Sequence, residues 1–86
     1  MKSKQDIIEH LKLLIEQTTF GRVKALSIKP TDRLIADLGL DSLDYAATML
    51  ACERWSNIRI KENEVHWSEV DTVEKLADLF IVHASL

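Results

Sequence analysis

Apolar residues recur at helical spacing in three separate stretches of this chain, and that spacing limits its fold more than any other feature. The first stretch runs from about Ser3 to Thr18. Its apolar residues make a single stripe: Ile7, Ile8, Leu11, Leu14 and Ile15. Either Ser3 or Asp6 is suited to cap the start, and the segment from Thr18 to Gly21 is suited to end the helix. We therefore expect a first long helix here.

Two more long helices follow from the same spacing. One begins near Ser42 and is expected to end between Trp55 and Asn57, with its apolar face made by Leu43, Ala46, Ala47, Leu50 and Ala51. The other opens on Asp71, a cap residue with Glu74 three positions on, which is a capping-box pattern. Its stripe continues to near His83 through Val73, Leu76, Ala77, Phe80 and Ile81.

The connections between these stretches are less regular. Ile58, Ile60 and Val65, with Trp67 nearby, predict a short helix or turn before the last long helix. The long connection 21–39 contains a turn at Lys29–Asp32. It also contains Leu34, Ile35 and Leu38, which we expect to form a helical turn packed on the core. The sequence thus predicts an all-α fold, a small bundle of four helices of which three are long and one is short.

Length and composition agree with this interpretation. The chain has 86 residues with only 2 Gly and 1 Pro, which favours helices over a turn-rich β fold. This size suits a single domain, 1–86, with one core and little room for a deep, water-excluding active site. The sequence shows no nucleophile–base pair, and His10, His66 and His83 lack the spacing of metal ligands. We therefore expect no catalytic residues and no metal site.

Charge and cysteine content exclude further classes. The formal net charge is −3, which does not suit nucleic-acid binding, because a nucleic-acid-binding face must neutralise phosphates. No apolar run approaches membrane-spanning length, and residues 1–6 do not lead into a signal-peptide core, so we expect a cytoplasmic protein without membrane insertion. Cys52 is the only cysteine and cannot form an intrachain disulfide, and we expect it to be a buried apolar residue.

The most informative segment is Asp37–Asp44, which opens the second long helix. Gly39 allows a tight turn into the helix, and either Asp41 or Ser42 can cap its first turn. If Asp41 is the cap, Ser42 is the first helical residue, and its hydroxyl lies at the partially positive helix end, which tolerates an attached phosphodiester. Taken alone, Asp41-Ser42-Leu43-Asp44 is explained as an ordinary helix start with Asp44 as an imperfect capping-box partner.

Gly39-Leu40-Asp41-Ser42-Leu43, with Leu38 upstream, resembles the core motif of the acyl carrier protein family, in which Asp-Ser-Leu is preceded by Gly-x. The resemblance covers most of the chain, because the order of helices and loops is also that of the family. It implies an acyl-carrier-like bundle in which Ser42 receives 4′-phosphopantetheine from coenzyme A through a separate phosphopantetheinyl transferase. Thioester-bound acyl groups are then carried on this arm between biosynthetic enzymes.

The resemblance also implies roles for the neighbours of Ser42. Asp41 matches the family aspartate that helps the transferase to dock, often through the magnesium ion of the transferase. Leu43, Asp44 and Glu53 are further candidates for docking the transferase or other partners. The family's folded-back apolar cargo implies five candidate lining residues: Ala46, Met49, Leu50, Ile60 and Leu79. Tyr45 lies one helical turn after Ser42 and either flanks the arm or packs in the core, and we expect Trp55 and Trp67 to be packing residues.

The second long helix departs from the family's strongly acidic pattern. Ala47 and Thr48 stand where the family often has a glutamate, Arg54 stands where a second acid is common, and Arg59 and Lys61 follow. These changes predict a specialised carrier served by its own acyl- or aminoacyl-loading ligase or synthase, although free variation at exposed positions also explains them. We expect a monomer.

Other functions remain open within and outside this class. Polyketide, aminoacyl and peptidyl carriers share the fold, and Asp41 favours the acyl type because peptidyl carriers often have His at this position. A different alternative is a helical interaction module that keeps the fold without the modification.

Overall fold

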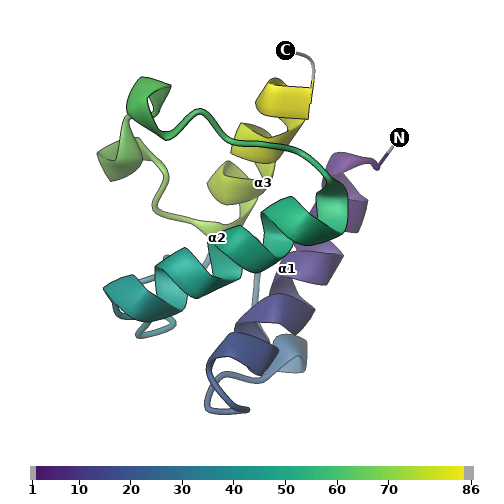
Figure 1. The fold of residues 1–86 in the computed structure, drawn as a ribbon. Helices are drawn as coiled ribbons and strands as arrows, with labels where there is room; N and C mark the ends of the chain where they lie inside the picture. The colour runs from purple at the N-terminus through teal and green to yellow at the C-terminus, as the bar shows by residue number, and fades with distance from the viewer. Residues whose placement is uncertain (1, 85–86) are drawn as a thin grey trace.

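The computed structural model describes residues 2–84, which form three long helices joined by loops with short 3₁₀ turns (Figure 1). The elements in chain order are α1 (Lys4–Thr18), η1 (Ala25–Ser27), α2 (Ser42–Ser56), η2 (Glu62–Glu64), η3 (Trp67–Glu69) and α3 (Val73–Ala84). The predicted all-α fold is confirmed. Within the described residues the only β-type pairing is an isolated antiparallel bridge between Arg33 and Thr72.

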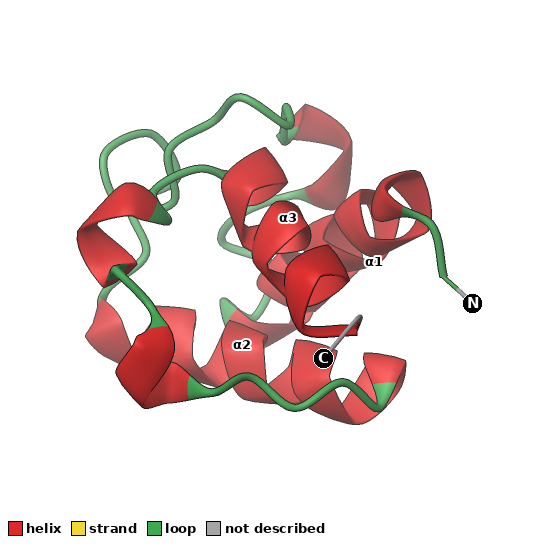
Figure 2. Ribbon diagram, turned by 90° about the horizontal axis from the view of Figure 1, so that it is seen from above, coloured by secondary structure: helices red, strands yellow, loops and turns green. Residues whose placement is uncertain are grey.

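The short third helix is replaced by two separate turns, η2 and η3. Neither turn buries a residue of its own. The residues of this segment that pack on the core do not follow the spacing of one helix face. They are Ile58, Ile60, Val65, Trp67 and Val70. The chain therefore alternates one-turn 3₁₀ helices with extended residues, and it runs back alongside α2 to reach α3 (Figures 1 and 2).

Helix α1 forms as predicted. Both expected cap residues act together, since Ser3 Oγ accepts a hydrogen bond from the Asp6 N–H and an Asp6 carboxylate oxygen accepts one from the Ser3 N–H, each at 3.1 Å. All five residues of the predicted stripe are buried. After the helix, Phe20 and Gly21 both have left-handed φ angles, of 53° and 81°, and so the chain reverses direction within two residues.

The predicted apolar face of α2 is wrong. The face that turns inward consists of Thr48, Met49, Cys52 and Ser56, whereas Leu43 and Leu50 remain 79% and 49% exposed. Apolar residues occur almost all the way round this helix, so their spacing does not mark one side. The buried Thr48 hydroxyl is satisfied by the Thr18 hydroxyl of α1 at 2.8 Å, and this pairing allows a polar residue to occupy the core side.

The cap of α3 also differs from the prediction. Thr72, not Asp71, caps the helix, with Thr72 Oγ1 accepting from the Lys75 N–H at 3.2 Å. The reason is tertiary: the first-turn N–H groups of Val73 and Glu74 donate to the Asp32 and Pro30 carbonyls of the long loop. Asp71 instead forms an ion pair with Lys75 at 3.0 Å.

The long loop between α1 and α2 is held against the core by part of its predicted turn. Leu34 is 1% exposed and Leu38 is half-buried, but Ile35 is 64% exposed, so the prediction that Ile35 packs on the core is wrong. Backbone hydrogen bonds from Asp37 and Leu38 to the Arg33 carbonyl close a single turn. One turn can direct only part of its side chains inward.

The core lies between α1 and the two other long helices, because α1 packs against both α2 and α3. Cys52 is fully buried there, as predicted, and burial raises the pKa of its thiol to about 12. None of the helices within residues 2–84 combines the length and apolar character needed to cross a bilayer.

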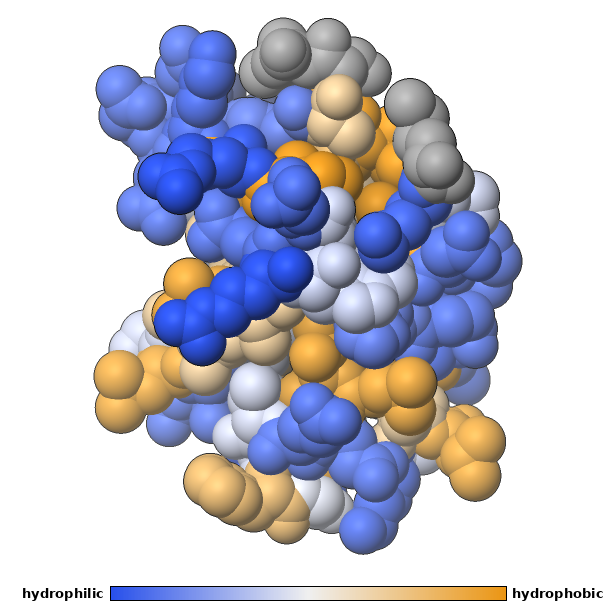
Figure 3. All heavy atoms as spheres, turned by 45° about the vertical axis from the view of Figure 1, so that its right-hand side comes forward, coloured by the Kyte–Doolittle hydropathy of each residue, from blue (hydrophilic) through white to orange (hydrophobic). Residues whose placement is uncertain are grey.

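Several large apolar side chains lie outside this core. Orange hydrophobic side chains protrude between hydrophilic ones on the face drawn in Figure 3. The large hydrophobic residues with the most exposed side chains are Leu13, Phe20, Leu26, Ile35, Leu43, Leu50 and Val82.

The two phenylalanines provide a direct test of this core assignment. Phe80 is 0% exposed and Phe20 is 97% exposed. We expect Phe80→Ala to lower the free energy of unfolding by about 3–5 kcal/mol, because it leaves a cavity. Phe20→Ala should change it by less than about 0.5 kcal/mol. Urea denaturation followed by circular dichroism measures both, and similar losses in the two variants would contradict the assigned core.

Candidate phosphopantetheine site

The start of α2 is fixed by a reciprocal hydrogen-bonded cap. Asp41 is the cap residue, and its carboxylate accepts from the Asp44 N–H at 2.8 Å. The Asp44 carboxylate in turn accepts from the Asp41 N–H at 3.3 Å. Of the two predicted cap residues the structure therefore selects Asp41, and Ser42 becomes the first residue of the helix.

Arg22 connects this cap to the loop that follows α1. Its guanidinium donates to Asp44 Oδ2 at 2.8 Å and to the Gly39 carbonyl at 3.3 Å. Gly39 has a φ of +72°, a conformation that suits glycine and brings the chain into α2. Sequence reasoning missed Arg22, because 22 residues separate it from Asp44 and no local pattern relates the two.

Ser42 itself is exposed and makes no hydrogen bond through its hydroxyl within residues 2–84. It lies at the helix end where backbone N–H groups have no carbonyl partner and the helix dipole favours negative charge. A phosphodiester on this oxygen would therefore meet a favourable field and no steric barrier. An exposed hydroxyl at this place can be reached by a second protein.

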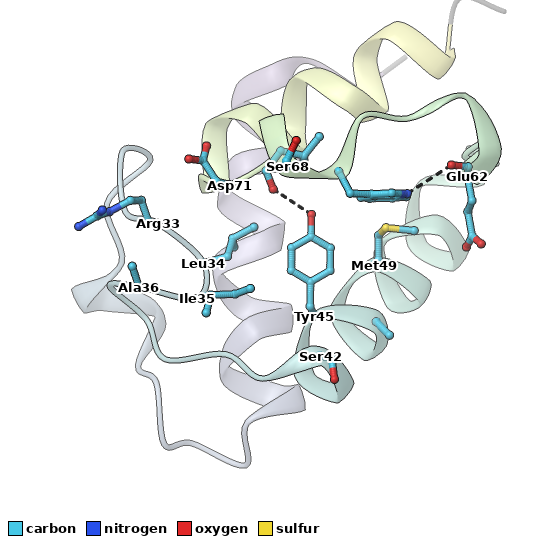
Figure 4. A pocket seen from close by; sticks show the side chains of 13 residues that line it. Arg33, Leu34, Ile35, Ala36, Ser42, Tyr45, Met49, Glu62, Ser68 and Asp71 are labelled. Carbon is cyan, nitrogen blue, oxygen red and sulfur yellow. Dashed lines mark hydrogen bonds between the residues drawn. The ribbon is translucent and has the colours of Figure 1, made fainter.

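A groove of about 690 Å³ begins beside Ser42 (Figure 4). Three elements form its walls: the turn after Arg33, the first two turns of α2, and the segment that contains η3. The lining is mostly apolar and consists of Arg33, Leu34, Ile35, Ala36, Ser42, Tyr45, Ala46, Met49, Glu62, Trp67, Ser68, Val70 and Asp71.

Tyr45 stands in the middle of this groove and ties its walls together (Figure 4). Its hydroxyl donates to the Val70 carbonyl at 3.0 Å, and its ring meets Trp67 edge-on, with centroids 6.1 Å apart. The Trp67 indole N–H donates to the Glu62 carbonyl at 3.3 Å. Tyr45 therefore serves in packing, and it lines the same groove as Ser42, beside which an attached arm would begin.

The candidate cargo-lining residues divide between two places. Ala46 and Met49 line the groove beside Ser42. Leu50 and Ile60 line a different groove at the far end of α2, and Leu79 lines neither. Two other residues line the groove beside Ser42 instead, Ile35 of the turn after Arg33 and Trp67 of η3. The only sequence signal for Trp67 was an aromatic residue within a polar linker, and no signal placed Ile35 there.

The predicted docking residues differ in how far their side chains are exposed and free to contact a partner protein. Asp41 is exposed and Leu43 is 79% exposed, so both can be contacted from outside. Asp44 is held in the cap and by Arg22. Glu53 is half-buried, and its Oε2 accepts from the Ile60 N–H at 3.0 Å, so it helps to hold the chain after α2.

Neither the histidines nor Trp55 lines this groove. His10 of α1 stacks on Trp55 of α2 with ring centroids 3.9 Å apart, which places Trp55 as a packing residue at the helix edge. Burial and the nearby Lys2 lower the pKa of His10. Within residues 2–84 no three His, Cys, Asp or Glu side chains gather in a way that could hold a metal ion.

The ionisation of Tyr45, the single tyrosine of the chain, can be used to test how deeply its side chain is buried in the groove. Burial, and secondarily the Asp71 carboxylate, raise the pKa of Tyr45 to about 12, above about 10 for an unfolded tyrosine. Because the folded pKa is the higher one, the stability linked to Tyr45 is complete below about pH 10 and is lost as the pH rises toward 12. We expect an ultraviolet titration of the native protein to show tyrosine ionisation with a midpoint near pH 12. In Tyr45→Phe, we expect the free energy of unfolding to fall less between about pH 10 and pH 12 than it does in the wild type. A native midpoint near that of free tyrosine would contradict the buried hydrogen bond to Val70.

Comparison with known proteins agrees with this geometry. The family model for the phosphopantetheine attachment site matches residues 15–80, which include the whole of α2, the turn at Gly39 and every residue of the groove. No significant match was found among curated proteins or among solved structures. Since the matched span covers well over half of the chain, the chain belongs to the phosphopantetheine attachment family, whose members are carriers with covalently bound 4′-phosphopantetheine.

Proposed function

We propose that this chain is an acyl carrier protein that bears its 4′-phosphopantetheine on Ser42 and passes thioester-bound acyl groups between biosynthetic enzymes. The observation that carries the proposal is the place of the Ser42 hydroxyl. It is exposed, lies at the N-terminal end of α2, and opens onto an apolar groove.

The other serines of the described chain support this choice. Ser3, Ser27 and Ser56 use their hydroxyls in hydrogen bonds to their own backbone neighbourhood. Ser68 lines the same groove as Ser42 and is also exposed, but it lies in the three-residue turn η3, and not at the start of a long helix. A helix as short as η3 offers much less of the dipole that favours a phosphodiester.

The groove favours an apolar cargo. Leu34, Ala46 and Met49 contribute carbon surface next to Ser42. Three charged side chains line it: Glu62, at the border shared with the groove at the far end of α2, and Arg33 and Asp71. The last two are already paired, Arg33 with Asp37 at 3.2 Å and Asp71 with Lys75 at 3.0 Å. Aminoacyl, peptidyl and polar polyketide cargo would therefore find no uncommitted charge at these two positions, which is why we place the acyl function first.

The partners follow from this function. A phosphopantetheinyl transferase transfers the arm and activates the Ser42 hydroxyl. Asp41 and Leu43, which are exposed on either side of Ser42, are the residues that this transferase contacts. A dedicated ligase or synthase loads the acyl group. In this proposal the chain is a cytoplasmic monomer with no catalytic step of its own.

The attachment site can be tested by intact mass spectrometry. The purified protein is incubated with coenzyme A, magnesium and a phosphopantetheinyl transferase of broad specificity. We expect a gain of one phosphopantetheine in the wild type and none in Ser42→Ala, because the acceptor oxygen is removed. Ser68→Ala is the matched control, since it removes a second exposed hydroxyl from the same groove, and it should gain the full mass.

Two results would contradict the proposal. Modification that persists in Ser42→Ala and disappears in Ser68→Ala would move the site to η3. No modification of a folded wild-type chain by several such transferases would instead favour the unmodified interaction module.

A further inference from the structure

The charged side chains of this protein are distributed unevenly. Five of its cations form ion pairs within residues 2–84, at distances of 2.8–3.2 Å: Lys4, Lys12, Arg22, Arg33 and Lys75. The six others form no ion pair with the described part of the chain, and three of these, Arg54, Arg59 and Lys61, are exposed and lie close together in the sequence. These three line one groove of about 900 Å³ at the C-terminal end of α2.

The local surroundings offset this charge only in part. Arg54 lies in the last turn of α2, where the helix dipole favours a cation, but Arg59 and Lys61 lie beyond the helix. Of the two acids that line the groove, Glu53 accepts a hydrogen bond from the Ile60 N–H through its Oε2, and Glu62 lies at the border shared with the groove of Ser42. The groove therefore carries more cations than acids on a chain whose net charge is −3.

Carbon surface lies among these charges. Leu50 is 49% exposed and Ile58 is half-buried, and both line the same groove. Figure 3 shows strongly hydrophilic side chains beside protruding hydrophobic ones on the face that it draws. A groove that combines some exposed carbon surface with cations suits a partner that offers an apolar side chain with carboxylates near it.

We propose that the groove around Arg54, Arg59 and Lys61 docks an acidic segment, with an apolar anchor, of an enzyme that loads or unloads the carrier. This inference rests on the proposed carrier function. Arg54 lies 12 residues after Ser42 on the same straight element, which is about 18 Å along the helix. A single partner can therefore hold this end of α2 while its active site receives the arm from the other end.

The proposal is tested with a synthetic Glu-rich peptide that contains one central Leu, titrated into ¹⁵N-labelled protein. Backbone amide shifts locate the binding site and give the dissociation constant. We expect the largest changes within residues 50–63, where the groove lies. We also expect binding to weaken as salt is raised, because the charges involved are exposed.

Matched double variants separate this groove from the overall charge. Arg59→Gln with Lys61→Gln removes two cations of the groove, and we expect at least about fivefold weaker binding. Lys24→Gln with Lys29→Gln makes the same change in net charge on two exposed lysines of the loop after α1, and it should alter binding by less than about twofold. The amide spectra of both variants show directly whether they are folded.

Three outcomes would overturn the inference. The backbone amides would show no shift at millimolar peptide, the two double variants would lose the same amount of peptide affinity, or a Lys-rich peptide of equal length would cause the same amide shifts. Equal binding of oligodeoxythymidine to these amides would assign the groove to phosphate chains instead. Phosphopantetheine loading of the same samples is followed by mass, so a chain that is loaded but does not bind the peptide refutes this inference alone, whereas a chain that is never loaded refutes the carrier function.

Discussion

The hydrogen-bonded cap formed by Asp41 and Asp44 is the constraint on which the functional end of this protein depends. It decides that α2 begins at Ser42, and Arg22 then joins the cap to the Gly39 carbonyl and thus to the loop after α1. The ion pair itself contributes little stability, because the Arg22 side chain is about half exposed. Its importance is geometric, since it fixes the direction in which the helix end points.

Local patterns predicted those parts of the fold whose causes are local. The α1 stripe, its cap at Ser3 and the helix start at Ser42 each follow from residues that lie at most three positions from the next one in the pattern. The buried face of α2 does not, because its apolar residues surround the helix and the choice of side depends on contacts with α1. The hydrogen bond between Thr18 and Thr48 spans 30 residues, so no window of the sequence contains it.

The site shows the same division. Ser42, Ala46 and Met49 share one helix and were accessible to sequence reasoning. Tyr45 acquires its place only because the segment with η3 returns alongside α2 and offers the Val70 carbonyl. Trp67 of η3 enters the groove for the same reason, whereas Ile35 enters it from the turn after Arg33. The cap of α3 is Thr72 and not the predicted Asp71, because carbonyls of a distant loop accept hydrogen bonds from the first N–H groups of the helix.

The burial of Cys52 has a consequence for the chemistry of the loaded protein. It is the only cysteine of the chain, it is fully buried, and its thiol ionises only far above neutral pH. Once the cofactor is attached, its terminal sulfur is therefore the one thiol open to electrophiles and oxidants. A disulfide that forms under oxidising conditions must join two arms, or an arm and another molecule. For the same reason, no thiol of the folded polypeptide competes with the cofactor for an acyl group.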